Sequence, residues 1–377
     1  MSIRLLVDCH AFDDDFRQGI TTYIAGLYGA AVKKARDIDF YFASRTPESL
    51  EPLFGRGSNV HYISLASGGR IKRLIGEFPS IIKKAKIDYA HFQYISPLIK
   101  SCREIITLHD ILFCDYPQFF SLKYRISKSF WFKRSARRAD VLLTVSNYSK
   151  SRISELWNIP EKRITVTPNA VASDWYDVQK NIDTKDLNIP FPRYILCVGR
   201  LEPRKNYALM LKCFRDLRLW EQGIGLIFAG HPAEKCARTQ DELSKLPPEG
   251  KKYVRFLKAV DDCMLKQLYL NASLFVFPSY AEGFGIPPLE AGVLEVPCLC
   301  SNVSAMADFD FFGEGYFSPY APEQLKEKLS MFFNGKLRLP PTDSIRETIR
   351  QRYSWSNSAD VLISAVYDNY GHWAENL

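Results

Sequence analysis

Residues 274–290 read LFVFPSYAEGFGIPPLE and combine three local signals in one stretch. The apolar run 274–276 predicts a buried strand, and Gly283 and Gly285 allow the backbone to approach a small molecule closely. A proline at 287 or 288 suits the first turn of a helix that continues through Glu290. A strand, a glycine loop and a helix start together predict a site for a phosphate or a sugar hydroxyl. Backbone N–H groups and the positive end of the helix dipole would face such a ligand.

The same alternation of short apolar runs and longer amphipathic stretches extends outward from this segment through the chain. This pattern is typical of βα units built around parallel sheets. In the first half we expect strands at Ile3 to Asp8, Ile38 to Phe42, Val60 to Ile63, Tyr89 to Phe92, Ile105 to Leu108, Val141 to Val145 and Ile164 to Val166. In the second half we expect strands at Tyr194 to Val198, Leu226 to Ala229, Val254 to Leu257, Leu274 to Val276 and Pro297 to Cys300.

A polar segment from Val171 to Pro192 interrupts the alternation and closes on two prolines, as a domain linker would. The predicted fold class is therefore α/β, with two Rossmann-like doubly wound domains that face each other across a cleft. The expected organisation is an N-terminal domain over 1–171, a linker over 172–192, a C-terminal domain over 193–355 and a C-terminal helix over 356–377 that packs back toward the first domain.

Composition narrows the class of protein further. A chain of 377 residues can bury a large core without disulfides, and its nine cysteines follow no metal or redox spacing. No run of 18 apolar residues could span a membrane, and the short apolar stretch Ile3 to Val7 ends in an acid, unlike a signal peptide. We therefore expect a cytoplasmic protein. The net charge of +8 is modest for this length and does not favour nucleic acid as a partner.

The stretch EGFGIPPLE at 282–290 resembles the E-x7-E signature of the family 4 retaining glycosyltransferases, which have the GT-B fold. The stretch GRLEPRKN at 199–206 resembles that family's glycine-arginine and lysine-asparagine motif. Further matches are His109 with Asp110, TVSNYSK at 144–150, PNA at 168–170 and Gly230 in IFAG. The resemblance spans nearly the whole chain, and its most specific part lies in the second half.

This resemblance implies roles for individual residues. Arg200 and Lys205 would bind the donor diphosphate, Glu290 would bond the ribose hydroxyls and Glu282 would hold the donor sugar. From the first domain, His109 would close over the sugar near its anomeric carbon. The expected donor-binding residues are Gly19, Ile20, Gly199, Gly230, Gly283, Phe284, Gly285, Ile286 and Glu290, and the expected catalytic residues are His109, Arg200, Lys205 and Glu282.

The sequence departs from the family pattern at two places. Gln18 precedes Gly19 where relatives often have two adjacent glycines, and residues 304–310 read SAMADFD where relatives commonly have a Pro-Glu pair. Both departures concern acceptor contacts and the fine placement of the donor.

Cleavage of a sugar–phosphate bond develops negative charge on the leaving nucleoside diphosphate, and fixed cations can stabilise that charge. Arg200 and Lys205 meet this need, so we expect neither a metal nor another cofactor. Asp13, Asp14 and Asp15 could suggest a divalent cation site. They follow the first strand without a second ligand cluster, which favours a solvated loop.

The expected reaction is a retaining, metal-independent transfer from a nucleotide sugar to a lipid-linked or oligosaccharide acceptor in cell-surface polysaccharide synthesis. GDP-mannose is the first choice of donor. It rests on likeness to bacterial mannosyltransferases of O-antigen and lipopolysaccharide assembly, through LHDILFCDYPQFF at 108–120 and RYSWSNSA at 352–359.

Alternative functions are a UDP-sugar-dependent transferase and an epimerase or phosphorylase on the same fold. A non-catalytic module that binds an anionic membrane is disfavoured, because the positive charge is too small and too local for that to be the main role. A glycoside hydrolase that uses Glu282 and Glu290 is disfavoured, because eight residues of helix would separate the two acids by about 12 Å.

Residues 117–139 contain seven Lys or Arg residues and no acid, with aromatic residues interleaved. This segment predicts peripheral contact with an anionic membrane or with a polyprenyl-diphosphate-linked acceptor. A solvated helix is the alternative. Phe130, Trp131 and Phe132 are consecutive and cannot all share one helical face, so at least one of them is expected near the surface.

Overall fold

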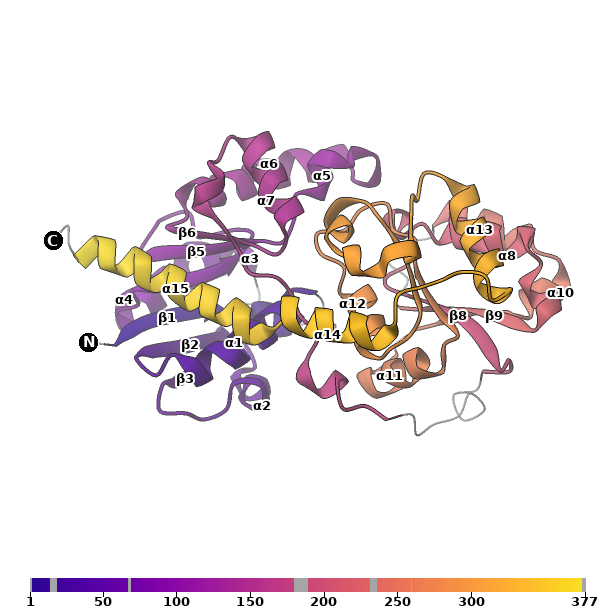
Figure 1. Cartoon of the computed structure of the whole chain (residues 1–377). Coiled ribbons are helices and arrows are strands. Elements are labelled where there is room, and N and C mark those ends of the chain that lie inside the picture. The colour runs from indigo at the N-terminus through magenta and orange to yellow at the C-terminus, as the bar shows by residue number, and fades with distance from the viewer. Residues whose placement is uncertain are drawn as a thin grey trace. The chain divides into compact units, whose positions relative to one another are not determined.

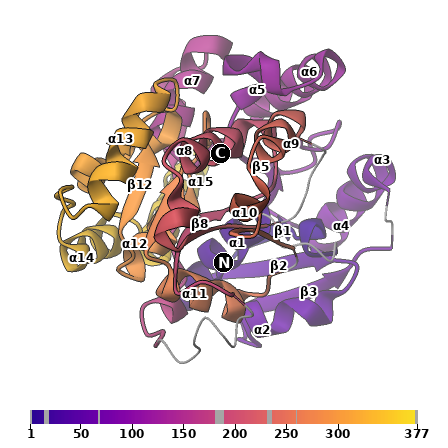
Figure 2. The same ribbon diagram turned by 90° about the vertical axis from the view of Figure 1, so that its right-hand side faces the viewer.

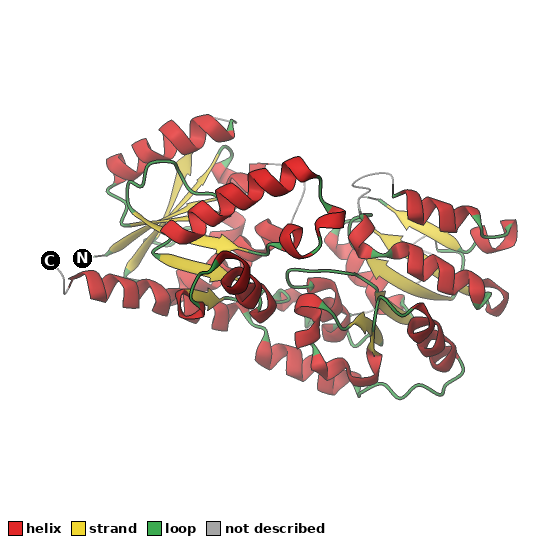
Figure 3. Ribbon diagram, turned by 90° about the horizontal axis from the view of Figure 1, so that it is seen from above, coloured by secondary structure: helices red, strands yellow, loops and turns green. Residues whose placement is uncertain are grey.

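The computed structural model of the chain describes residues 2–13, 19–66, 69–179, 189–230, 236–258 and 260–374, with side chains up to 371. The chain divides into two compact units. Unit 1 comprises residues 1–170 together with 353–377, and unit 2 comprises residues 171–352. In each unit helices cover both faces of a parallel sheet, as Figure 3 shows with the strands in yellow and the helices in red.

The sheet of unit 1 has seven strands in the order β3-β2-β1-β4-β5-β6-β7, and all neighbouring strands are parallel. The direction of winding changes between β1 and β4, which is the topological switch point of this sheet. The strands are β1 (Ile3–Asp8), β2 (Ile38–Ser44), β3 (Val60–Ser64), β4 (Tyr89–Gln93), β5 (Arg103–Leu108), β6 (Val141–Thr144) and β7 (Ile164–Val166).

The sheet of unit 2 repeats this arrangement with six strands in the order β10-β9-β8-β11-β12-β13, again all parallel. Its switch point lies between β8 and β11. The strands are β8 (Arg193–Val198), β9 (Ile224–Ala229), β10 (Val254–Leu257), β11 (Leu274–Phe277), β12 (Cys298–Ser301) and β13 (Tyr316–Phe317).

The predicted α/β class and the two doubly wound sheets are confirmed, and twelve predicted strands occur within two residues of their expected ends. The reason is that strands covered on both faces are apolar along their whole length. Every residue of β9 and of β11 is buried. The short edge strand β13 was not predicted, because two residues carry no detectable periodicity.

The helices of unit 1 are α1 (Gly19–Lys34), α2 (Glu51–Phe54), α3 (Arg70–Lys72), α4 (Phe78–Ala85), α5 (Leu112–Asp115), α6 (Leu122–Arg138), α7 (Asn147–Trp157) and α15 (Trp355–Ala374). Those of unit 2 are α8 (Tyr207–Asp216), α9 (Ala237–Ser244), α10 (Pro248–Lys251), α11 (Asp262–Asn271), α12 (Ile286–Val293), α13 (Pro322–Phe333) and α14 (Thr342–Arg352). In Figure 2, α8 and α13 lie side by side in unit 2.

The last helix, α15, belongs to unit 1 although it follows the whole of unit 2 in sequence (Figure 1). It packs along α1, where the Trp355 ring fills the space beside Gly26: a Cβ on that glycine would lie 2.1 Å from the ring. Lys34 at the end of α1 reaches Asp360 at 2.5 Å. Unit 1 is therefore assembled from both ends of the described chain.

The described part of the expected linker, residues 172–179, belongs to unit 2. Trp175 is buried there against Tyr269, with ring centroids 5.8 Å apart, and Asp174 pairs with Lys266. The rest of the expected linker up to 188 lies outside the described residues. In the described residues no helix is both long enough and apolar enough to cross a membrane.

Candidate active site

The loops at the switch point of unit 2 carry most of the charged residues predicted for the site. β8 is followed by residues 199–206, and β11 is followed by residues 278–285. Because β8 and β11 are neighbouring parallel strands, both loops leave the same edge of the sheet. In open α/β sheets, ligands bind at this edge.

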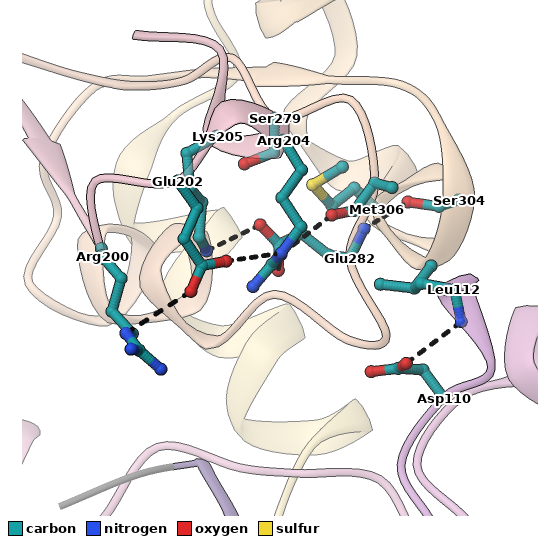
Figure 4. Close-up of polar contacts among 12 residues, drawn as sticks. Asp110, Leu112, Arg200, Glu202, Arg204, Lys205, Ser279, Glu282, Ser304 and Met306 are labelled. Carbon is teal, nitrogen blue, oxygen red and sulfur yellow. Dashed lines mark hydrogen bonds and ion pairs between the residues drawn. The ribbon is translucent and has the colours of Figure 1, made fainter. Parts of the chain in front are cut away.

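Glu282 lies at the centre of an ion cluster formed by these two loops (Figure 4). Its Oε1 is 2.7 Å from Nζ of Lys205, and its Oε2 is 2.7 Å from Nη1 of Arg204. Burial alone would raise the pKa of Glu282, but the charges of Arg204 and Lys205 outweigh it and lower the pKa to about 2. Glu282 is therefore ionised near neutral pH and cannot donate a proton there.

Lys205 is held in place from several sides. It ends a short 3-10 turn, Pro203–Lys205, and is only 7% exposed. Its Nζ lies 4.9 Å from the centroid of the Phe277 ring. A Cβ on Gly199 would lie 3.2 Å from Cε of Lys205, so a glycine at this position leaves room for the ammonium. Burial lowers the pKa of Lys205, and the carboxylate of Glu282 opposes that lowering.

Arg200 stands outside the buried part of the cluster. Its side chain is 57% exposed, and its Nε lies 3.4 Å from Oε1 of Glu202. The other oxygen of Glu202 accepts a hydrogen bond of 2.9 Å from Nε of Arg204. The structure thus brings Lys205 into direct contact with Glu282 and connects Arg200 to the same cluster through Glu202.

Gly199 and Gly230 directly follow the neighbouring strands β8 and β9 and lie close together. Gly230 has φ of +148°, and a Cβ there would lie 2.2 Å from the carbonyl oxygen of Gly199. A larger residue at 230 would therefore clash with the backbone of the loop that carries Arg200. The close approach of the two backbones therefore requires glycine at position 230.

The predicted helix start after the glycine loop is present. Gly285, with φ of +103°, directly precedes α12, and Pro287 and Pro288 occupy its first turn. Gly283, Phe284 and Gly285 are buried, whereas Ile286 is partly exposed. The loop is fixed by Ser304, whose Oγ accepts a hydrogen bond of 2.9 Å from the backbone N–H of Glu282.

Glu290, in α12, has a different setting from Glu282. Its Oε2 accepts a hydrogen bond of 2.8 Å from the hydroxyl of Tyr269 in α11, and no cation pairs with it among the described residues. Burial raises the pKa of Glu290 to about 7, although the Tyr269 hydrogen bond acts in the opposite direction. One of the two acids is thus fully ionised near neutral pH, and the other is partly protonated.

In unit 1, His109 directly follows β5 and belongs to a buried chain of neutral polar groups. Its Nε2 donates to Oε1 of Gln93 at 2.8 Å, and the Gln93 amide donates to Nε2 of His91 at 3.3 Å. Nδ1 of His91 lies 2.6 Å from the hydroxyl of Tyr28 in α1. Burial lowers the pKa of His109 and of His91 to about 3, so both imidazoles are neutral at physiological pH.

The first turns of α1 lie beside His109 in unit 1. Gly19 and Ile20 are the first two residues of this helix, and the ring of Tyr23, one turn later, is 4.9 Å from the ring of His109. A Cβ on Gly19 would meet no atom within 4 Å, so this glycine is not required by packing. The preceding Gln18 lies outside the described residues.

The acidic loop after β1 is only partly described. Oδ1 of Asp13 accepts hydrogen bonds from Oγ of Ser44 at 2.6 Å and from the backbone of Arg45 at 2.9 Å. Asp14 and Asp15 lie outside the described residues. Within the described ranges, no three His, Cys, Asp or Glu side chains are grouped to hold a metal ion.

Sequence reasoning missed four residues that support the predicted ones, namely Gln93, Arg204, Tyr269 and Ser304. Arg204 stands next to Lys205 and could have been chosen on charge alone, but the sequence does not show which arginine turns toward Glu282. The other three are polar residues in or beside apolar elements, and a buried polar group needs a partner.

Two family models match the chain in succession. Residues 17–175 match the model described as Glycosyltransferase Family 4, and residues 179–352 match the model described as Glycosyl transferases group 1. The first match lies almost wholly in unit 1 and the second lies in unit 2.

Two curated relatives carry related names. The chain is 33% identical over 234 residues to "O-antigen chain mannosyltransferase B" of Escherichia coli, covering 59% of this chain and 60% of the relative. It is 30% identical over 252 residues to "O-antigen chain mannosyltransferase RfbU" of Salmonella typhimurium, covering 63% and 65% respectively. The chain thus spans less than two thirds of the length of these relatives.

Solved structures resemble the whole described fold. A sucrose-phosphate synthase from Thermosynechococcus elongatus superposes with a TM-score of 0.74 at 16% identity, covering 98% of this chain and 99% of that one. Anabaena HepE in complex with UDP-glucose gives a TM-score of 0.71 at 14% identity, covering 97% and 100%. At these identities the likeness concerns the fold alone.

Proposed function

We propose that the chain, which belongs to the group 1 and family 4 glycosyltransferases, transfers a hexose from a nucleotide sugar to a hydroxyl of a glycan acceptor. The observation that carries this proposal is the ion cluster of Glu282, Lys205 and Arg204 at the switch point of unit 2. With Arg200 and Glu202 the cluster holds three cations and two carboxylates, which leaves one net positive charge at the edge where ligands bind.

The proposed chemistry is a substitution at the anomeric carbon. The bond between this carbon and the diphosphate oxygen breaks, the acceptor oxygen bonds to the carbon, and the proton of the acceptor hydroxyl passes to the departing diphosphate. Negative charge develops on the leaving diphosphate, and Lys205 and Arg200 stabilise it. Because protein cations supply this charge, we propose that the reaction needs no metal. We also propose that it retains the anomeric configuration, as the resemblance to retaining transferases implies.

The two acids have separate roles in this proposal. Glu282 is ionised, so it accepts a hydrogen bond from a hydroxyl of the donor sugar and keeps Lys205 in position. Glu290 accepts hydrogen bonds from the ribose hydroxyls once it is ionised. His109 is neutral and takes part through hydrogen bonding, without acting as an acid.

GDP-mannose is the proposed donor, and a lipid-linked or oligosaccharide acceptor of O-antigen or lipopolysaccharide synthesis is the proposed acceptor. The printed names of the two bacterial relatives support this choice. A UDP-sugar is the second candidate donor. A cytoplasmic location is proposed because nucleotide sugars are the substrate.

Calorimetric titration of the full chain with GDP, UDP, ADP and their sugars tests the donor assignment. We expect the tightest binding for GDP and GDP-mannose, followed by mannose transfer to a glycan acceptor. Tighter binding of UDP-glucose would replace the donor but keep the reaction class. A protein that binds none of these nucleotides and transfers no sugar would refute the proposed function.

An epimerase is the alternative of another reaction class. A putative UDP-N-acetylglucosamine 2-epimerase from Listeria monocytogenes has a TM-score of 0.62 at 13% identity, which concerns the fold alone. Conversion of a nucleotide sugar to its epimer in the absence of acceptor would favour this alternative.

A further inference from the structure

Exposed apolar side chains gather on unit 1. Eleven large hydrophobic side chains are exposed among the described residues, and ten of them belong to this unit. On α6, Leu122, Ile126 and Phe130 follow one another at four-residue spacing and are 65%, 64% and 62% exposed. Residues four apart share one helix face, so these three form an apolar stripe. Contiguous exposed apolar surface of this kind marks a binding site.

The apolar stripe is one wall of a groove of about 570 Å³, which we call the α6 groove. Arg125, Ser129 and Lys133 form a second row at the same spacing along α6 and also line it. Phe113 of α5 contributes a further apolar side chain. The α6 groove therefore presents hydrocarbon and positive charge side by side.

Within the described part of the chain, two cations of the groove have no anionic partner. Arg125 and Lys133 form no side-chain hydrogen bond or ion pair with any described residue, and Nε of Arg125 is buried without a partner. Arg134 and Arg137, which also line the groove, donate to the carbonyl oxygens of Leu98 at 2.6 Å and of Trp157 at 3.3 Å. An unpaired buried donor is uncommon in folded proteins, and this one belongs to a side chain that lines the α6 groove.

Nearby acids are already engaged. Oδ1 of Asp115, in α5, lies 2.6 Å from Arg152, and its other oxygen accepts a hydrogen bond of 2.8 Å from Tyr148. Glu104 lies 3.7 Å from Arg138, so one of the seven basic residues does find an acid, outside the basic segment. Arg138 therefore has an acidic partner from outside residues 117–139, whereas Arg125 and Lys133 have none within the described residues.

We propose that the α6 groove binds anionic phospholipid and attaches the protein to a membrane surface. The lipid phosphate pairs with Arg125 and Lys133, and the acyl region covers the apolar stripe. A soluble sugar phosphate would satisfy the two cations but leave Leu122, Ile126 and Phe130 in water. An amphiphile satisfies both parts of the groove, and a bilayer supplies it at high local concentration.

Cosedimentation of the full chain with vesicles tests this assignment. We expect binding to phosphatidylglycerol vesicles at low salt and much weaker binding to phosphatidylcholine vesicles. The double variant Arg125→Ser with Lys133→Ser should lower the partition coefficient by roughly tenfold or more. The triple variant Leu122→Ser, Ile126→Ser and Phe130→Ser should remove the salt-resistant part of binding. These three side chains are exposed, so the fold should survive, which thermal unfolding can verify.

A matched control separates the groove from diffuse charge. The double variant Lys123→Ser with Lys128→Ser removes the same charge from the same helix but outside the lining of the groove. We expect it to bind at least about fivefold better than the groove variant. Equal losses in the two variants would overturn the groove in favour of general electrostatic attraction.

A polyprenyl phosphate is the alternative ligand for the α6 groove. Binding that appears only when polyprenyl phosphate is added to phosphatidylcholine vesicles would overturn the phospholipid assignment and identify the groove with an acceptor lipid. Absence of binding to every vesicle would overturn the membrane site altogether. Neither readout depends on sugar transfer, so failure here is distinct from failure of the proposed function.

Discussion

The two units have the same order of strands around their switch points but place opposite kinds of polar chemistry there. In unit 2 the loops hold ionised groups, with Glu282 between Lys205 and Arg204. In unit 1 the acid Asp8 ends β1, and beside it the ends of β4 and β5 hold a neutral chain of hydrogen bonds through His109, Gln93 and His91. The sheet topology therefore determines where a site forms, and the loop side chains determine whether it works by charge or by neutral hydrogen bonding.

The strongest test of this contrast removes a cation from unit 2. Lys205→Ala and Arg200→Ala should each lower turnover by about 10² or more, because each removes charge that stabilises the leaving diphosphate. Turnover with a saturating nucleotide sugar measures the effect. Arg218→Ala serves as the control, since Arg218 is an exposed cation of unit 2 that pairs only with Glu221 at 3.3 Å among the described residues.

If Lys205→Ala and Arg200→Ala both kept turnover within a few-fold of the unaltered chain, the site of unit 2 would not work by charge. Thermal unfolding must accompany the Lys205 variant, because loss of its ion pair with Glu282 also removes a buried contact.

A second test breaks the neutral chain of unit 1. Gln93→Leu removes the acceptor of the His109 Nε2–H bond and leaves a buried donor unpaired, which should destabilise the fold by about 1–3 kcal/mol. The His109 ring is then no longer held by this bond, so turnover should fall as well. The ¹⁵N chemical shifts of the His109 ring report whether its tautomer changes.

The conservative variant Gln93→Glu distinguishes positioning from structure. A carboxylate accepts the same bond, so turnover should largely return, but it also favours the imidazolium and raises the pKa of His109. A new acidic limb should then appear in the pH profile. If Gln93→Leu left both turnover and the nitrogen shifts unchanged, Gln93 would have no positioning role.

A third test uses the different ionisation of the two acids in unit 2. With a pKa of about 7, Glu290 falls from about 90% to about 10% ionised between pH 8 and pH 6, so the KM for the nucleotide sugar should rise about tenfold. Glu282, whose pKa is about 2, contributes no change in this window. Glu290→Gln should flatten the profile, and an unaltered slope in that variant would contradict the assignment.

The same group has a consequence for stability, with a definite sign. The folded-state pKa of Glu290 lies above its ordinary value of 4.5, so its protonated form favours folding. That contribution is fully present below about pH 4.5 and is lost as the pH rises through about 7. Glu290→Gln should therefore unfold at a higher temperature than the unaltered chain at pH 8, with little difference at pH 5.

The smallest expected effect concerns metal. If Arg200 and Lys205 supply the positive charge that unit 2 needs, EDTA should change turnover by less than about twofold. Dialysis against chelator followed by an assay with and without added manganese measures this. Loss of activity in EDTA that manganese restores would show that protein cations are insufficient.

Sequence alone was sufficient for every strand of the two sheets except β13, because parallel strands buried on both faces are continuous apolar runs. The order of the motifs also located the two switch-point loops of unit 2, since GRLEPRKN begins directly after β8 and EGFGIPPLE begins at 282, shortly after β11 ends at Phe277. The direction of individual side chains could not be predicted. Arg200 and Arg204 have the same charge and the same loop, and only the packed structure distinguishes the exposed one from the one that contacts Glu282.

The neutral chain of unit 1 shows a second limit of sequence reasoning. Gln93 and His109 are 16 residues apart, and they meet only because β4 and β5 pair in parallel. The aromatic run at 130–132 was predictable to a larger extent. Consecutive helical residues point in different directions, and Phe132 is buried while Phe130 is exposed, as expected.

The return of α15 to unit 1 has a consequence for synthesis of the chain on the ribosome. Ala359, Leu362 and Val366 of α15 are buried in unit 1, yet they are translated after all of residues 171–352. The surface of α1 that contacts Trp355 therefore stays exposed to solvent until the ribosome has made the intervening unit. Unit 2, whose residues are contiguous, can complete its fold first, so the usual order in which the N-terminal domain matures earliest is reversed.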